Sequence, residues 1–421
     1  MPSNKQQAKV FYGWWVVVAC FFFSLYIGGG VFYGFTAIFE PIADEFRWSY
    51  AQISLAASLR GMEIGLLAPF VGLLVDRWGP RRLMFLGAIL AGLGLMLLSR
   101  VTSLPMFYGA FALVALGMST SSSTVLMTAV ANWFRKKVSL AVGITISGFG
   151  VGGLLVPVVV GLVDIFEWRM AMLIWGLGAF VLCAPLSLLV RHKPEPYGYL
   201  PDGEVNIIAT PDEALISAQM PQDKSAVKQA LTSAFFWHLA LSQTFLGMAL
   251  AAVFTHVMPY LSSIGIERSI SGQLAAVIPL VSIGGRLGFG WLGDRFEKRW
   301  IAVLGFALAT VGLFCFALAA GGEKWLLAPF ILLFSSGYGG SNTMRVALVR
   351  EYFGRARFGT VHGLVVGIMM LGQIIGPALA GWAYDEWDSY LGIWFIFAAL
   401  TLLSLIIMSV APLVRDHNQT V

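Results

Sequence analysis

Twelve apolar stretches, most of them about twenty residues or longer, alternate with polar segments along the chain. A helix needs about 20 apolar residues to cross a hydrocarbon core roughly 30 Å thick. The pattern therefore predicts an all-α membrane protein with twelve membrane-spanning helices. The expected spans are residues 12–38, 50–74, 81–99, 104–133, 138–163, 169–190, 235–262, 270–292, 300–319, 325–352, 358–383 and 388–413.

A longer polar segment separates the sixth apolar stretch from the seventh. It holds five of the 17 prolines and has the composition of a linker. We therefore expect an N-terminal six-helix half over residues 1–190, a cytoplasmic linker over 191–234 and a C-terminal six-helix half over 235–421.

Composition supports this interpretation. Hydrophobic residues make up 58% of the 421 residues and charged residues only 12%, whereas a soluble protein carries about 25% charge. The net charge of +5 comes from short basic clusters between apolar stretches, so we expect a lipid bilayer as partner and no nucleic acid. The three cysteines are isolated, and no nucleotide-binding loop or cluster of metal ligands is found. We expect no metal site, no cofactor and no enzymatic activity.

Lys and Arg predict the orientation. With both termini in the cytoplasm, 19 of the 27 basic residues lie on the cytoplasmic side, five lie outside and three fall within spans. Cytoplasmic loops carry the excess of Lys and Arg in membrane proteins. We expect a multi-pass protein of the cell inner membrane with both termini cytoplasmic.

The two halves repeat each other. Gly72, Asp76, Arg77 and Arg81 recur 218 residues later as Gly290, Asp294, Arg295 and Arg299. Gly143, Gly152, Pro157 and Gly161 recur 220 residues later as Gly363, Gly372, Pro377 and Gly381. Parallel repeats of this kind are a known transporter plan, with the substrate site at the repeat interface near the middle of the bilayer.

The stretch GLLVDRWGPRR, residues 72–82, resembles the loop motif of the major facilitator superfamily, and GWLGDRFEKR, residues 290–299, is a degenerate second copy. The resemblance implies the fold of that superfamily. It also implies that Asp76 and Arg77, with Asp294 and Arg295, act as gating residues that hold the cytoplasmic face closed. The alternative is a basic loop that only determines topology.

Two further segments resemble the proton-coupled monocarboxylate transporters. They are WFRKKVSLAVGITISGFGVG, residues 133–152, and, in part, YGWWVVVAC, residues 12–20. The chain is similar to a bacterial member of that family, close to the oxalate/formate antiporters. The resemblance implies a monomeric secondary transporter that moves a small monocarboxylate, such as L-lactate or pyruvate, together with a proton by alternating access.

Arg286 is the only charged side chain in residues 269–293. It lies eight residues before Asp294, roughly 12 Å along a helix. A charge inside the membrane costs at least about 2.5 kcal/mol, so it faces a cavity or a partner. A carboxylate suits its planar fork, and the resemblance assigns this arginine to the substrate carboxylate. The alternative is an ion pair with Glu63.

The family's usual proton-coupling groups are missing. Ser282 stands where relatives carry an aspartate, and Tyr33 aligns with their first-span lysine. Two proton-coupling candidates remain. Glu63 has Arg60 three residues before it, and a structural pair is the alternative role. His256 has a suitable intrinsic pKa, and a packing histidine bonded to a carbonyl is the alternative.

Tyr338 and Asn342 are further candidates for substrate binding, beside Tyr33 and His256. The side chain of Tyr338 or Asn342 could form a hydrogen bond with a 2-hydroxy or 2-oxo group near the arginine. The eleventh span contains no Lys or Arg, which favours one negative charge per substrate over the dianions of an oxalate exchanger. A non-transporting membrane sensor for anions is the alternative from another class.

Overall fold

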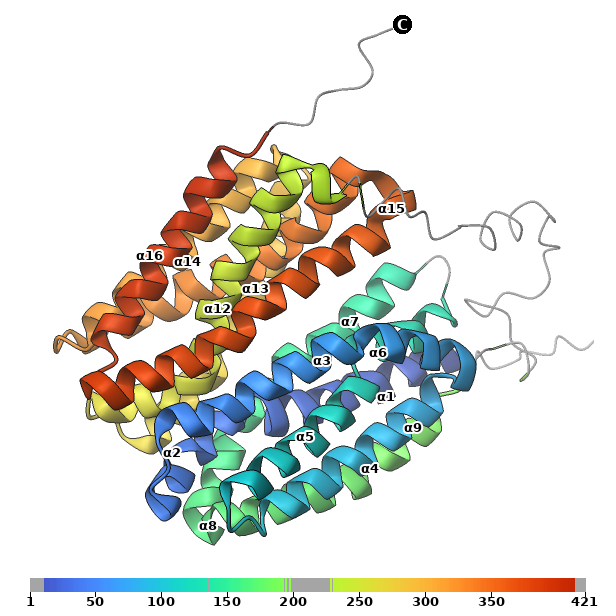
Figure 1. The fold of residues 1–421 in the computed structure, drawn as a ribbon. Helices are drawn as coiled ribbons and strands as arrows, with labels where there is room; N and C mark the ends of the chain where they lie inside the picture. Colours follow the sequence, from blue (N-terminus) through green and yellow to red (C-terminus); the bar gives the residue numbers. More distant parts are fainter. Residues whose placement is uncertain are drawn as a thin grey trace, which may run out of the picture. The chain divides into compact units, whose positions relative to one another are not determined.

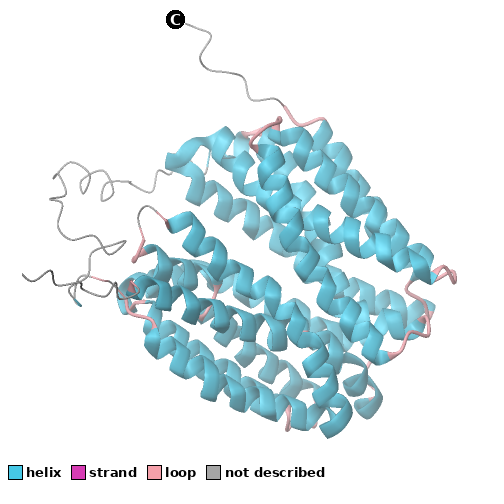
Figure 2. Ribbon diagram, turned by 180° about the vertical axis from the view of Figure 1, so that it is seen from behind, coloured by secondary structure: helices cyan, strands magenta, loops and turns pink. Residues whose placement is uncertain are grey.

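The computed structural model describes residues 11–134, 137–192, 194, 197, 228 and 230–412. In this part of the chain the secondary structure is helical and no strand occurs (Figures 1 and 2). The predicted all-α membrane fold is confirmed.

The first half of the chain contains α1 (Tyr12–Tyr26), the π-helical η1 (Ile27–Tyr33), α2 (Phe35–Phe46), α3 (Tyr50–Trp78), α4 (Pro80–Leu98), α5 (Leu104–Thr120), α6 (Ser123–Ala131), α7 (Val138–Val151), the 3-10 turn η2 (Gly152–Leu155), α8 (Val156–Gly178), η3 (Ala179–Cys183) and α9 (Ala184–Leu189). The second half contains α12 (Ala234–Ser263), α13 (Arg268–Gly293), α14 (Lys298–Ala319), η6 (Lys324–Leu326), α15 (Leu327–Trp387) and α16 (Leu391–Ser409).

Nine helical stretches of the described part are long and apolar enough to cross a membrane. One of them, Leu140–Leu189, covers the expected fifth and sixth spans. Glu167 interrupts it with φ 65° and ψ 160°, which a helix cannot contain, so the chain turns there. The expected second span falls on α3, and the tenth and eleventh both fall on α15.

The chain packs into two compact units. In unit 1 (Met1–Phe32, Leu66–Gly152 and Arg169–Thr210), α1 packs against α7, and α4 packs against α5 and α9. In unit 2 (Tyr33–Gly65, Gly153–Trp168 and Pro211–Val421), α12, α13 and α14 each pack against α15, and α16 covers α12 and α14 (Figure 1). Because α2 also packs against α12, unit 2 includes segments of both predicted halves. The boundaries of the halves remain a prediction from the repeat.

Glycines bring α13 and α15 close together inside unit 2. A Cβ on Gly285 would lie 2.5 Å from the Ser336 carbonyl oxygen, and one on Gly339 would strike the Ser282 carbonyl. Small residues allow this backbone approach in membrane helices. The contact lies beside Arg286 and therefore positions the face of α15 that the arginine meets.

This close approach gives a stability prediction with an adjacent control. Gly285→Ala should lower the free energy of unfolding by about 1–3 kcal/mol, the usual penalty for overpacking. Gly284→Ala should not lower it, because a Cβ at Gly284 meets no atom within 4 Å and alanine favours the helix. Thermal unfolding of both variants in detergent checks this, and equal melting temperatures would contradict it.

Candidate functional site

Arg286 lies on α13, one turn after Ser282. Its side chain is half-buried, and its Nε is buried with no hydrogen-bond partner in the described residues. None of the ion pairs in the described part of the chain includes it. A guanidinium stays charged even when it is buried. Arg286 thus offers an unpaired positive charge and at least one free donor.

Two tyrosines accompany Arg286. Tyr33, at the end of η1, and Tyr338 on α15 are both buried and both interact electrostatically with the arginine. The ring of Phe254 on α12 joins them, with its centroid 5.1 Å from that of Tyr33 and 5.8 Å from that of Tyr338. The Tyr338 hydroxyl is buried close to both Ser282 and Arg286, but it makes no hydrogen bond of normal geometry in the described part of the chain. It is a second polar group open to a ligand.

One face of α15 carries three of the polar side chains. Tyr338, Asn342 and Arg345 are spaced i, i+4 and i+7, which places them on the same side of a helix. Asn342 and Arg345 are half-buried. The structure therefore groups Arg286, Tyr33, Tyr338 and Asn342, four of the five predicted substrate-binding residues, around α13, α15 and the end of η1.

Arg345 is the member of this group that sequence reasoning missed. It interacts electrostatically with Arg286, and His362, farther along α15, interacts with Arg345. Its Nη1 donates to the Met369 sulfur at 2.9 Å, and its Nε is buried without a partner in the described residues. Its position as a lone charge in an apolar stretch was the same indication that identified Arg286.

His256, the fifth predicted binding residue, belongs to a different cluster. It is fully buried, and its Nε2 lies 3.0 Å from the Pro377 carbonyl oxygen and 2.9 Å from Ser54 Oγ. Its Nδ1 lies 2.9 Å from the Tyr390 hydroxyl. A carbonyl only accepts, so Nε2 carries the proton and Nδ1 accepts from Tyr390. These contacts fit the packing alternative, and a role for His256 in proton coupling stays a prediction.

The described part of the chain holds no group of three or more metal-ligating side chains. The arrangement around Arg286 consists of positive charge, neutral hydroxyls and an aromatic ring. Such a set binds an anion through charge and hydrogen bonds.

A family profile described as Major Facilitator Superfamily matches residues 14–365 and 289–420. The chain belongs to the major facilitator superfamily. It is therefore a transporter rather than an enzyme.

The chain is similar over most of its length to proteins named monocarboxylate transporters. The chain is 27% identical over 430 residues to monocarboxylate transporter 12 of Rattus norvegicus, covering 97% of this chain and 87% of that protein. It is 25% identical over 404 residues to monocarboxylate transporter 13 of the same species, covering 93% and 87%.

Solved structures share the fold. A bacterial homologue of the human lysosomal transporter Spinster, in an inward-facing unoccupied conformation, gives a TM-score of 0.73 at 15% identity and covers 96% of both chains. A D-xylose–proton symporter gives 0.73 at 14% identity, covering 95% of this chain and 98% of that one.

Of the gating residues predicted for this superfamily member, Arg77, Asp294 and Arg295 are exposed. None of these three forms an ion pair in the described part of the chain, and the Arg295 guanidinium lies 3.9 Å above the Trp291 ring. The side chains of Asp76 and of Glu63 lie outside the described residues. The cytoplasmic gate therefore stays a prediction.

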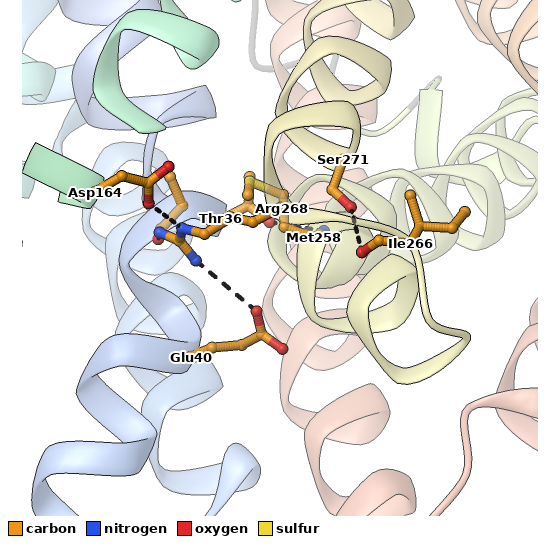
Figure 3. Close-up of polar contacts among 8 residues, drawn as sticks. Thr36, Glu40, Asp164, Met258, Ile266, Arg268 and Ser271 are labelled. Atoms are coloured by element: carbon orange, nitrogen blue, oxygen red, sulfur yellow. Dashed lines mark hydrogen bonds and ion pairs between the residues drawn. The ribbon is translucent and has the colours of Figure 1, made fainter. Parts of the chain in front are cut away.

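The helix ends that the charge distribution predicts to be outside do carry ion pairs. Arg268, at the start of α13, donates from Nε to Asp164 Oδ1 at 2.8 Å, and its Nη1 lies 3.9 Å from Glu40 Oε2. It also donates to the Ala37 carbonyl. Figure 3 shows the Arg268 guanidinium between the carboxylates of Asp164 and Glu40. This outer cluster of Arg268, Asp164 and Glu40 connects α2 and α8 of the first half with α13 of the second.

A second polar contact lies among these outer helix ends. The carboxylate of Asp385, near the end of α15, accepts from the backbone N–H groups of Tyr50 and Ala51, both at 2.8 Å. These are the first two residues of α3, whose amides have no partner within the helix. Asp385 therefore acts as an N-terminal cap supplied by another helix.

The outer cluster predicts a graded effect of its two carboxylates. Asp164→Asn should make the outer helix ends more accessible to solvent than Glu40→Gln does. The reason is that Asp164 makes the shorter contact with Arg268. Loss of an exposed ion pair costs about 0.5–1 kcal/mol, which should raise the alkylation rate of the reporter cysteine described next about two- to fivefold. The measurement is the alkylation rate of Ala37→Cys, in a background without other cysteines, by a membrane-impermeant maleimide. Glu351→Gln, which removes the pair with Lys298 far from the outer cluster in sequence, should leave the rate unchanged.

Proposed function

We propose that the protein is a secondary active transporter of small monocarboxylates, such as L-lactate or pyruvate, and that it couples their movement to protons. The observation that carries the proposal is the unpaired guanidinium of Arg286, with its buried Nε lacking a partner in the described residues. The similarity to monocarboxylate transporters 12 and 13 supports this substrate class.

The groups around Arg286 suit a carboxylate with a small substituent. The guanidinium can take both carboxylate oxygens in a planar fork. The Tyr338 hydroxyl, buried close by, can donate to a 2-oxo group or exchange hydrogen bonds with a 2-hydroxyl. Phe254, between Tyr33 and Tyr338, offers an apolar surface to a short aliphatic tail. Among the described residues, no carboxylate forms an ion pair with Arg286.

Transport follows by alternating access. In this proposal the outer cluster around Arg268 and the cap at Asp385 release when the site opens to the outside and re-form when it closes. The contacts in the described outer ends link segments of the first half to helices of the second, as such a gate requires. The predicted cytoplasmic residues Asp76, Arg77, Asp294 and Arg295 take the corresponding role on the other side.

The carboxylate anchor is tested by lactate uptake into proteoliposomes. Arg286→Gln should lower uptake at least about tenfold, because charge-assisted hydrogen bonds contribute about 1.5–3 kcal/mol. Arg286→Lys, which keeps the charge but loses the fork, should retain part of it. The control is Arg100→Gln, since Arg100 is exposed in a loop. Undiminished uptake by Arg286→Gln would overturn the proposed anchor, and absence of labelled counterflow in the wild type would favour a sensor.

Proton coupling is tested with Glu63→Gln and His256→Gln. In the wild type, an inward proton gradient should drive lactate accumulation. The variant that removes the proton carrier should keep lactate counterflow, which needs no net proton movement, and lose gradient-driven accumulation. A wild type indifferent to the gradient would favour an exchanger of the oxalate/formate type over a symporter.

A further inference from the structure

We propose that Arg345 is a second anion-binding residue, and that the site at Arg286 also takes short dicarboxylates of two to four carbons. This extends the proposed function, because it rests on a carboxylate being bound at Arg286. Its basis is the grouping of two buried guanidinium Nε atoms that lack partners in the described residues.

The two arginines lie close to the same segment of α15 in unit 2. Tyr338 and Arg345 lie on one face of α15, roughly 10.5 Å apart along the helix axis by the rise per residue. Arg286 interacts electrostatically with both of them, so its guanidinium lies alongside the segment of α15 between them. Asn342 is on the same face within this segment. A ligand bound to Arg286 would therefore lie along α15 between Tyr338 and Arg345.

Arg345 lacks the partners of a structural arginine. Its Nη1 donates to the Met369 thioether, which is a weak acceptor. It forms no ion pair in the described part of the chain. The positive charge of Arg286 repels it. Two like charges in an apolar interior raise the free energy of the empty site, and a bound anion relieves that repulsion.

Charge balance favours a dianion. Arg286 and Arg345 together contribute two positive charges, so a monocarboxylate neutralises one of them and a dicarboxylate neutralises both. A carrier whose loaded site has no net charge changes conformation at lower electrostatic cost than one whose site is charged. Each carboxylate would also meet its own guanidinium fork. The neutral hydroxyl of Tyr338 and the amide of Asn342 suit the short segment that joins the carboxylates.

A structural role for Arg345 makes a different prediction. Arg345 lies five residues before the exposed Arg350, about 7.5 Å along the helix, so its side chain could extend toward the cytoplasmic end. In that case its replacement would affect all substrates alike. Selective loss of dicarboxylates is the result that only a binding role explains.

The experiment measures inhibition of labelled L-lactate counterflow in proteoliposomes by unlabelled oxalate, malonate, succinate and propionate. In the wild type, at least one dicarboxylate should inhibit as well as propionate or better. Arg345→Gln should raise the inhibitory concentration of that dicarboxylate about tenfold or more, and change that of propionate less than about threefold. Arg345→Lys should restore part of the inhibition. Arg350→Gln, on the same helix, should behave as the wild type.

The outcomes separate this proposal from the one it rests on. No inhibition by any dicarboxylate in the wild type, or an equal effect of Arg345→Gln on dicarboxylates and propionate, overturns the role of Arg345 and leaves lactate transport standing. Undiminished lactate uptake by Arg286→Gln overturns the carboxylate anchor itself. If Arg345→Gln does not fold, as judged by size-exclusion chromatography, the wild-type competition series and Arg345→Lys decide.

Discussion

Two arginines without a carboxylate partner in the described part of the chain are the constraint on which the candidate site in unit 2 depends. Arg286 and Arg345 lie in apolar helices, and neither forms an ion pair in the described part of the chain. Burying a charge without a partner is costly. A bound anion would offset part of that cost by supplying the opposite charge. The glycine contact between α13 and α15 keeps the arginine beside Tyr338. The same contact that packs the helices thus positions the charge.

Hydrophobic pattern alone predicted the helices well, because length and apolarity are what a bilayer demands. It was less informative about where helices end. The first span was expected to stop at residue 38, but α2 continues to Phe46 through the amphipathic sequence FEPIADEF. Its acidic residues Glu40, Asp44 and Glu45 end the apolar run without ending the helix. The π-helical η1, with its three consecutive glycines, was also not predicted, since no periodicity distinguishes it from the helix that precedes it.

The candidate site was predictable where a single residue could be recognised from the sequence around it. Arg286 stands out as a lone charge in an apolar stretch. The contribution of Arg345 depends on which neighbour it meets across the bundle, and Phe254 contributes through contacts between helices that no sequence spacing encodes. His256 shows the converse. A buried histidine at a suitable position suggests proton transfer, but only the structure reveals that Pro377, Ser54 and Tyr390 occupy both ring nitrogens.

The cap that Asp385 provides to α3 differs in kind from the ion pairs around Arg268. Its acceptor is one side chain, but its donors are the main-chain amides of Tyr50 and Ala51. No side-chain replacement at those two positions removes the donors, proline excepted. Most substitutions at Tyr50 or Ala51 therefore leave the donors of this cap in place, and replacement of Asp385 removes it most directly. Separation of the two segments would leave the amides to water, so in the proposed gate the hydration of a helix end contributes to the free energy of opening.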